Sequence, residues 1–423
     1  MNRFSRDFGR TSVIVPEAVV REGEDGTAEQ IMKRAAASGT DMAVRGAGRS
    51  CNTQTLSPGM VLDNLREGAA PRFTGQDDLV DVPSGVTWLA LETWLHQHGR
   101  ANPVLPSYLN LTVGGTLSIG GFGPGSLHCG LQVDQVVEIE LIDGAGRSLR
   151  CSPRENSELF QYALGGLGQV GFIKRAVLRT VPHQAATPVS RVQHAGLSEL
   201  TGFMKQVTKD PGIRGYFGMY DRASWYSQVS YASETGGTET GGTGLAGQAQ
   251  LVPDLPLRLH EEVDQHLLPL LDVESRANIW ADYVLDEAGL DDITGLLEEL
   301  IHEPPLAQTL ISLYFLVIQR PQPATPFVFA PALDAPVQYG VGVFTSVDSS
   351  DSRALAGTKR VQRQLLSACA KAKGRPYLYG SHEFDAGLLE GFYGGAALRR
   401  LEELREQHSL TRFNQRAFGG PRP

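Results

Sequence analysis

The sequence has few of the features that mark membrane, secreted or nucleic-acid-binding proteins. No run approaches the 18 or more apolar residues of a membrane span, and the N-terminal stretch 1–7 lacks the apolar core of a signal peptide. The formal net charge is −9 and no Lys/Arg-rich run occurs, which argues against a nucleic-acid surface. We therefore expect a cytoplasmic protein with neither a membrane nor a nucleic acid as partner.

Cysteine is scarce, and neither cysteine nor histidine occurs in a pattern typical of metal sites. The four cysteines, Cys51, Cys129, Cys151 and Cys369, are widely separated and form no CxxC. The ten histidines form no HxxxH or HExxH motif. These absences predict no disulfide framework and no metal site.

The composition is otherwise that of an ordinary globular protein, with 41% apolar and 20% charged residues. A chain of 423 residues is too long for one ordinary core and suits two, or two with a cap.

The first part of the chain alternates short strands with few helices. Thr27 is a plausible N-cap for a helix over 27–38, and apolar spacing predicts a second helix over 88–98. A glycine-dense loop is expected over 113–130, and the turn at Asp143 to Gly146 indicates a hairpin. Strands are predicted over 13–15, 42–44, 79–83, 136–142 and 172–181. This pattern is typical of an α+β domain.

The composition changes near residue 184, where longer strand-like and helical segments begin. Strands are predicted over 216–219, 226–231, 310–318 and 339–346, and helices over 197–207, 288–300, 352–372 and 396–407. Residues 233–250 are rich in Gly and Thr and are expected to form a flexible loop. We predict a first domain over 1–183, a substrate or cap domain over 184–374, and a C-terminal segment over 375–423 that returns to the first domain.

Three glycine segments carry the functional signal: residues 43–51, 111–123 and 164–173. Small residues let backbone N–H groups approach a diphosphate closely. The third segment has GxGxxG-like spacing at Gly166, Gly168 and Gly171, but it follows a helix and precedes a strand, the reverse of a Rossmann fingerprint. The P-loop pattern GxxxxGK[ST] is absent.

In this order, the three segments resemble the flavin domain of the vanillyl-alcohol oxidase superfamily, the PCMH-type FAD-binding fold, and most of all that of cytokinin dehydrogenases. The similarity covers about residues 5–182, including Arg45-Gly-Ala-Gly-Arg-Ser and Leu111-Thr-Val-Gly-Gly-Thr-Leu-Ser. The resemblance implies an α+β fold in which two α+β subdomains hold FAD and an α+β cap with an antiparallel sheet covers the isoalloxazine.

Matched position by position, the resemblance implies a set of residues that contact FAD. They are Val44, Arg45, Gly46, Ala47, Gly48, Arg49, Ser50, Gln54, Thr112, Gly114, Gly115, Thr116, Ser118, Phe122, Gly168, Ile173, Tyr377, Asn414 and Gln415.

Two positions depart from the family pattern. Arg49 stands where many relatives carry the histidine that bonds covalently to the flavin, so we expect non-covalent FAD. Arg49 either neutralises the diphosphate, faces a substrate anion, or is a solvent-exposed loop residue. Cys51 or Cys129 is a conceivable alternative tether, although a free buried cysteine is the more common case.

The second departure is Ser107, which stands where cytokinin dehydrogenases carry the aspartate that takes a proton from the substrate amine. Serine cannot serve as that base unaided, so cytokinin oxidation by the family mechanism is not expected. The remaining catalytic candidates are Tyr108, His128 and His382, each of which also has an ordinary structural interpretation.

The sequence therefore predicts an FAD-dependent oxidoreductase that removes a hydride from a C–N or C–O carbon of a small molecule, in secondary metabolism. Dioxygen or another acceptor would take the electrons, and a monomer or homodimer is expected. Two alternatives stay open: an NAD(P)H-dependent reductase of the same fold, and a flavin-fold protein that has lost redox chemistry.

Overall fold

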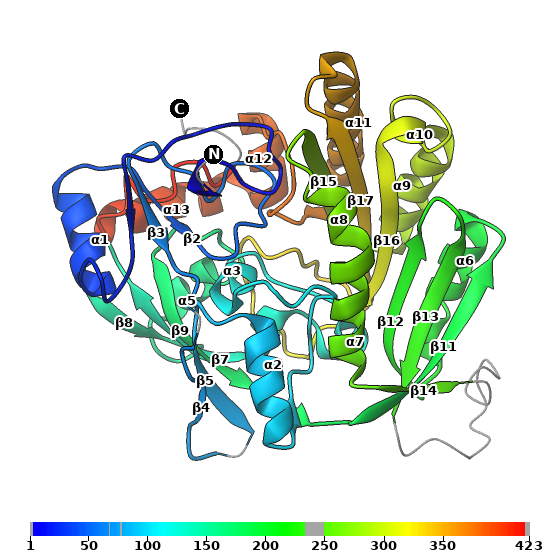
Figure 1. Cartoon of the computed structure of the whole chain (residues 1–423), viewed down its shortest axis with the longest axis horizontal. Coiled ribbons are helices and arrows are strands. Elements are labelled where there is room, and N and C mark those ends of the chain that lie inside the picture. Colours follow the sequence, from blue (N-terminus) through cyan, green and yellow to red (C-terminus); the bar gives the residue numbers. More distant parts are fainter. Residues whose placement is uncertain (1–2, 67, 77, 233–248, 419–423) are drawn as a thin grey trace.

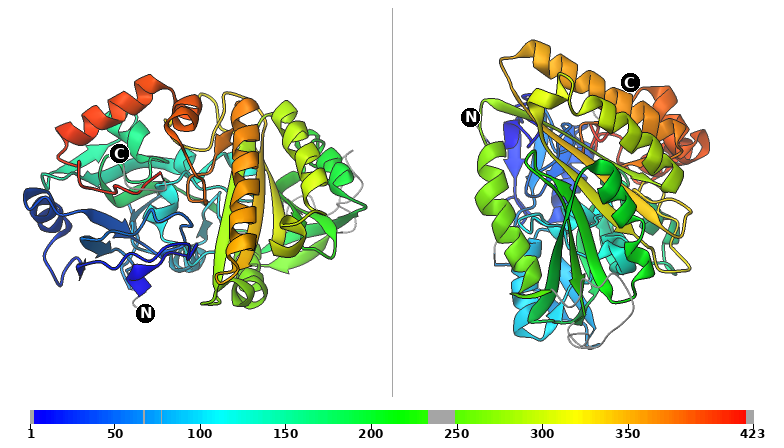
Figure 2. Two further views of the ribbon diagram at one scale, coloured as in Figure 1. Left: turned by 90° about the horizontal axis from the view of Figure 1, so that it is seen from above. Right: turned by 90° about the vertical axis from the view of Figure 1, so that its right-hand side faces the viewer.

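The computed structural model describes residues 3–66, 68–76, 78–232 and 249–418, so most of the expected loop 233–250 lies outside the described residues. Two lobes lie side by side (Figure 1). One contains the N-terminal part and the last helices, and the other contains a large sheet with its own helices (Figure 2). Within the described residues, no helix is both long and apolar enough to cross a membrane.

A small parallel sheet opens the first lobe, in the order β1 (Ala18–Val20), β3 (Met60–Asp63), β2 (Met42–Arg45). Helix α1 (Ala28–Ala37) starts at Thr27 as predicted, and Thr27 and Gln30 form a capping box. The strand predicted over 13–15 is wrong, because Val13 and Val15 are exposed and the first strand begins at Ala18.

The second sheet of this lobe is antiparallel, with five strands. Their order is β4 (Arg72–Phe73), β5 (Leu79–Pro83), β9 (Phe172–Arg179), β7 (Val136–Ile142), β8 (Ser148–Cys151). The hairpin expected at Asp143 joins β7 to β8. A short ladder pairs β6 (Arg100–Ala101) with β10 (Val181–Pro182).

The predicted α2 (Trp88–Gln97) has ten residues, as many as α1. The glycine-dense stretch 113–130 is less irregular than expected, because it contains α3 (Val113–Leu117) and α4 (Ser126–Cys129). The remaining short helices are α5 (Ser157–Ala163) and the 3-10 turns Arg3–Ser5 and Gln132–Gln135.

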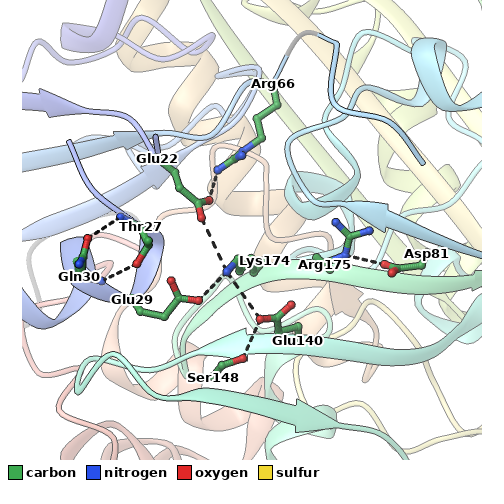
Figure 3. A network of polar contacts seen from close by, with 10 residues as sticks. All are labelled: Glu22, Thr27, Glu29, Gln30, Arg66, Asp81, Glu140, Ser148, Lys174 and Arg175. Carbon is green, nitrogen blue, oxygen red and sulfur yellow. Dashed lines mark hydrogen bonds and ion pairs between the residues drawn. The ribbon is translucent and has the colours of Figure 1, made fainter. Parts of the chain in front are cut away.

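Lys174 connects the two sheets of the first lobe (Figure 3). This residue lies on β9, and its ammonium group is 2.6 Å from Glu29 of α1. It is also 3.8 Å from Glu22, which follows β1, and 3.8 Å from Glu140 of β7. Carboxylates from α1, from the segment after β1 and from β7 thus share one cation, which links α1 and β1 to the five-stranded sheet.

The second lobe is built on an eight-stranded antiparallel sheet. Its order is β14 (Gln250–Pro253), β11 (Ala186–His194), β13 (Trp225–Tyr231), β12 (Ile213–Tyr220), β16 (Leu310–Ile318), β17 (Gln338–Asp348), β15 (Arg276–Leu285), β18 (Arg375–Pro376). Helices α6 (Leu197–Met204), α9 (Glu287–Leu300) and α11 (Ser352–Lys371) contact its strands. Two short elements, the 3-10 turn Val207–Lys209 and α10 (Leu306–Thr309), connect these parts.

Two further segments join the lobes. Helices α7 (Leu255–Glu262) and α8 (Leu268–Leu271), linked by the π-helical turn Val263–Leu267, lie at the front between the lobes (Figure 1). Helices α12 (Ala386–Tyr393) and α13 (Gly395–Gln407) then bring the chain back to the first lobe, where Phe413 bridges Met42 of β2. The predicted α+β class with antiparallel sheets is confirmed.

Candidate functional site

A cavity of about 320 Å³ lies where the lobes meet, within the usual size range of small-molecule sites. All three glycine segments line it from the first lobe. Strands β12, β15, β16 and β17 line it from the second lobe, and the α7–α8 segment also contributes to its wall.

Most of the residues predicted to contact FAD line this cavity. They are Val44, Gly46, Ala47, Gly48, Arg49, Ser50, Gln54, Thr112, Gly114, Gly115, Thr116, Ser118, Phe122, Gly168, Ile173, Tyr377 and Asn414. The candidates Ser107 and Tyr108 line it as well. Residues from widely separated parts of the sequence thus come together in one space.

The first glycine segment presents free backbone donors to the cavity. The N–H groups of Gly46, Ala47 and Gly48 have no hydrogen-bond acceptor within the described part of the chain. Gly48 has φ +71°, and a Cβ atom at Gly46 would collide with the Thr112 hydroxyl of the second segment. This close approach of two segments forms a cradle of N–H and O–H donors suited to a diphosphate.

Asn414 ties the first glycine segment to the third. Its Oδ1 accepts the N–H of Val44 at 3.3 Å, and its Nδ2 donates to the carbonyl of Gly168 at 2.9 Å. The C-terminal return therefore sets the spacing of the cradle.

Two of the predicted FAD contacts lie outside the residues that line the cavity. Arg45 is buried, and its guanidinium group donates to the Thr55 hydroxyl at 3.2 Å. Gln415 instead hydrogen-bonds the carbonyl of Thr411. Both side chains have structural partners in the protein itself.

Arg49 lines the cavity and also binds the second lobe. Its guanidinium is 2.9 Å from Asp272, which follows α8, and 3.3 Å from the Tyr108 hydroxyl. The same group lies over the rings of Phe8 and Tyr108. Among the three roles open from the sequence, that of a solvent-exposed loop arginine does not match this geometry.

The two candidate histidines do not line the cavity. His128 hydrogen-bonds the carbonyl of Ile213 at 2.7 Å, and His382 hydrogen-bonds that of Tyr377 at 2.9 Å. Burial lowers the pKa of His382 to about 4, so its imidazole is neutral at physiological pH. Both side chains contact backbone rather than the space where a substrate would bind.

Neither of the two cysteines considered as a covalent tether for the flavin lines the cavity. Cys51 is fully buried, and burial raises the pKa of its thiol well above the ordinary value. Cys129 is partly buried, and burial raises the pKa of its thiol too. Protonated thiols outside the cavity are poor nucleophiles toward a bound flavin.

The sequence reasoning missed the acidic group of the cavity, Asp282 on β15. Because side chains alternate along a strand, Asp282 and Trp280 project from the same face, and both line the cavity. Asp282 is 3% exposed, and its Oδ2 has no hydrogen-bond partner within the described residues. The sequence signal that could have identified it is a single carboxylate within the otherwise apolar run 279–285.

Tyrosines surround this carboxyl group. The Tyr379 side chain lies beside it, and Tyr314 of β16 lies near Ser107 of the first lobe. Burial raises the pKa of Asp282 to about 7, and the neighbouring Tyr379 hydroxyl opposes this rise. The second lobe thus supplies a titratable group where the first lobe carries only serine.

The donor set fits FAD. Within the described lining, Arg49 is the sole cation and Asp282 the sole carboxylate, and the glycine cradle itself contains no acidic side chain. The lining also contains the aromatic side chains Phe8, Trp280 and Tyr377, on which a flat flavin ring can pack. The indole N–H of Trp280, another residue of this lining, has no hydrogen-bond partner among the described residues.

Comparison with known proteins decides the nature of the first lobe, because residues 16–152 match the family described as an FAD binding domain. The chain carries a PCMH-type FAD-binding domain. FAD is accordingly the cofactor, and the predicted resemblance to the vanillyl-alcohol oxidase superfamily is confirmed.

Relatives of this FAD-binding protein include plant and bacterial oxidoreductases. Cytokinin dehydrogenase 7 of Oryza sativa subsp. japonica is 33% identical over 206 residues, which cover 47% of this chain and 39% of the rice protein. The uncharacterized oxidoreductase ORF5 in the fasciation locus of Rhodococcoides fascians is 34% identical over 200 residues, 46% of this chain and 44% of its own. The alignments therefore span less than half of these relatives.

Proposed function

We propose that this protein is an FAD-dependent oxidase or dehydrogenase that acts on a CH–NH or CH–OH group of a small neutral molecule. The observation that carries the proposal is the position of Asp282, a buried carboxyl group that lines the same cavity as the glycine cradle. A related FAD-binding domain and relatives that are named as oxidoreductases support it.

Bound FAD would supply the acceptor for the hydride that leaves the substrate carbon. The residues of this chain then have to accept the proton that leaves the substrate N–H or O–H. Oδ2 of Asp282 has no hydrogen-bond partner among the described residues, and the Tyr379 side chain lies beside the carboxyl group. A carboxyl group with a pKa of about 7 suits a general base at neutral pH.

The walls near Asp282 define the substrate class. Met219, Tyr314 and Phe344 lie on three neighbouring strands and line the same space. The described lining of the second lobe contains no cation, so an anionic substrate has no partner there. We propose a flat, largely apolar amine or alcohol that packs between these side chains.

The FAD is proposed to be non-covalent, since Arg49 replaces the linking histidine and neither Cys51 nor Cys129 lines the cavity. After acid precipitation of the yellow protein, all flavin should appear in the supernatant. Flavin retained in the pellet would contradict the non-covalent assignment, and the variants C51A and C129A would then identify the tether.

The test of function is anaerobic reduction of the bound FAD by a panel of aromatic amines and alcohols, with NADPH as the rival reductant. We expect at least one amine or alcohol to bleach the flavin, and the D282N variant to do so about 100-fold more slowly. The control D210N carries the same change on a buried aspartate of the second lobe that does not line the cavity. Bleaching by NADPH alone, or no loss in D282N, would refute the proposal.

A further inference from the structure

A second polar cluster lies away from the FAD cavity, where the two lobes meet near β6 and β10. It consists of His96 near the end of α2, His183 directly after β10, and Asp254 between β14 and α7. One ligand atom from each of the three side chains lies within 4.8 Å of the others. None of the three residues lines the cavity described above.

The distances in this cluster match those between ligands of a tetrahedral metal ion. Oδ1 of Asp254 lies 3.5 Å from His96 Nδ1 and 3.2 Å from His183 Nε2. Bonds of 2.0–2.1 Å to a tetrahedral Zn²⁺ separate neighbouring ligand atoms by about 3.4 Å. The two imidazole rings lie side by side, with their centroids 3.8 Å apart and their planes inclined by 29°.

A buried carboxylate orients the first of these histidines. Glu92, four residues earlier on α2 and fully buried, lies 2.9 Å from His96 Nε2 through its Oε1. Its Oε2 accepts both the backbone and side-chain N–H groups of Asn102. An Nε2–H donated to Glu92 leaves the Nδ1 lone pair directed at the cluster, which is the arrangement of carboxylate, histidine and metal in zinc sites.

Asp254 is also directed at the histidines rather than at its own helix. It stands at the N-cap position of α7, where aspartate ordinarily accepts a backbone N–H of the first turn, yet its side chain makes no capping bond. Its backbone has φ 41°, and its N–H donates to the carbonyl of Ala185, two residues beyond His183. The backbone is thus held in a strained conformation that turns the carboxylate toward the histidines.

We propose that His96, His183 and Asp254 form a binding site for a Zn²⁺-class transition-metal ion, with water in the remaining coordination position. Two imidazoles and a carboxylate are ligands that Zn²⁺ accepts. The ion would join α2 and β10 of the FAD-binding lobe to the start of α7, whose continuation lines the cavity. The motif-based expectation of no metal site cannot detect such ligands, because they come from three distant segments.

The test uses the FAD-loaded full chain after dialysis against a chelator, titrated with ZnCl₂ by calorimetry and checked by metal analysis. We expect one Zn²⁺ per chain and a Zn²⁺-dependent rise in Tm. H183A and D254N should bind Zn²⁺ at least 10-fold more weakly, and E92Q about 10- to 100-fold more weakly.

The matched control is H98A, because His98 lies on the same helix end but hydrogen-bonds the carbonyl of Trp94 instead. H98A should bind Zn²⁺ like the unmodified chain. The FAD content of each variant reports correct folding, and D254N changes a side chain that is 46% exposed. Absence of Zn²⁺ binding by the unmodified chain, or equal affinity in properly folded H183A and D254N, would overturn the proposal.

Discussion

Arg49 of the first glycine segment and Asp272 of the second lobe form an ion pair of 2.9 Å at the edge of the cavity. Arg10 binds the same carboxylate at 3.0 Å. Asp272 directly follows α8, so this contact fixes the end of the helical segment that covers the cavity. The first glycine segment is thus linked directly to the second lobe.

The D272N variant should therefore retain FAD less firmly. The pair is partly exposed, with side chains 24% and 36% accessible, so we expect a loss of about 1 kcal/mol, or roughly a fivefold faster release of FAD. Release is measured by the recovery of flavin fluorescence after dilution. The control is D291N, which removes an exposed carboxylate of α9 that pairs with Lys205, and it should release FAD at the normal rate. Equal release rates in D272N and D291N would contradict this role of Asp272.

Asp282 makes the stability of the protein depend on pH. The unfolded carboxyl group loses its proton near pH 3.8, whereas the folded one keeps it until about pH 7. Raising the pH across this window therefore destabilises the folded state, by up to about 4 kcal/mol. An asparagine does not titrate, so D282N is not destabilised as the pH rises. The free energy of unfolding of D282N should equal that of the unmodified protein near pH 4 and should exceed it increasingly up to pH 7. The free energy of unfolding is measured by urea denaturation at each pH. A difference between D282N and the unmodified protein that stays constant from pH 4 to pH 7 would contradict the raised pKa.

Gly46 should tolerate no side chain. A Cβ atom there would collide with the Thr112 hydroxyl, so G46A must separate two glycine segments. We expect a loss of about 1–3 kcal/mol in stability and at least a tenfold loss in FAD affinity, measured by denaturation and flavin titration. G202A is the matched control, because nothing lies within 4 Å of a Cβ at this position in α6. Normal FAD binding by G46A would show that the close contact is dispensable.

Lys174 should stabilise the first lobe through its three carboxylates (Figure 3). Replacement by methionine keeps the aliphatic stem and leaves Glu29 and Glu140 without this cation, whereas Glu22 still pairs with Arg66, so we expect about 1 kcal/mol of destabilisation. Urea denaturation at low and high salt measures it, and added salt should reduce the difference. The control is K209M, which changes a lysine whose described hydrogen bond goes to Gln206, and it should have little effect on stability. A similar loss of stability in K174M and K209M would mean that the loss comes from the change in net charge and not from the three ion pairs of Lys174.

Local sequence determined much of the fold, because the signals act over a few residues. Thr27 starts α1, and the apolar alternation over 136–142 forms β7 with the predicted bounds. The strands β11 and β15 were missed. The expected strand at 13–15 failed because its valines find no sheet partner and stay exposed.

The cradle was likewise accessible from sequence, because glycine segments are contiguous and their backbone donors need no distant partner. The titratable group could not be found in this way. Asp282 acquires its raised pKa only when β15 buries it beside Tyr379, some hundred positions along the chain. His382, which the sequence favoured as acid or base, is neutral and bound to backbone for the same reason: burial is set by packing.

The sequence by itself determined that the chain has an α+β fold with three glycine segments, and that Arg49 and Ser107 depart from the pattern of the family it resembles. These features follow from residue type and local spacing. Only the tertiary structure decided which residues of the second lobe lie near these features. Packing of the second lobe pairs Asp272 with Arg49, adds Asp282 to the cavity lining, and brings His96, His183 and Asp254 together. Long-range contacts of this kind depend on how sheets pack, which no short segment encodes.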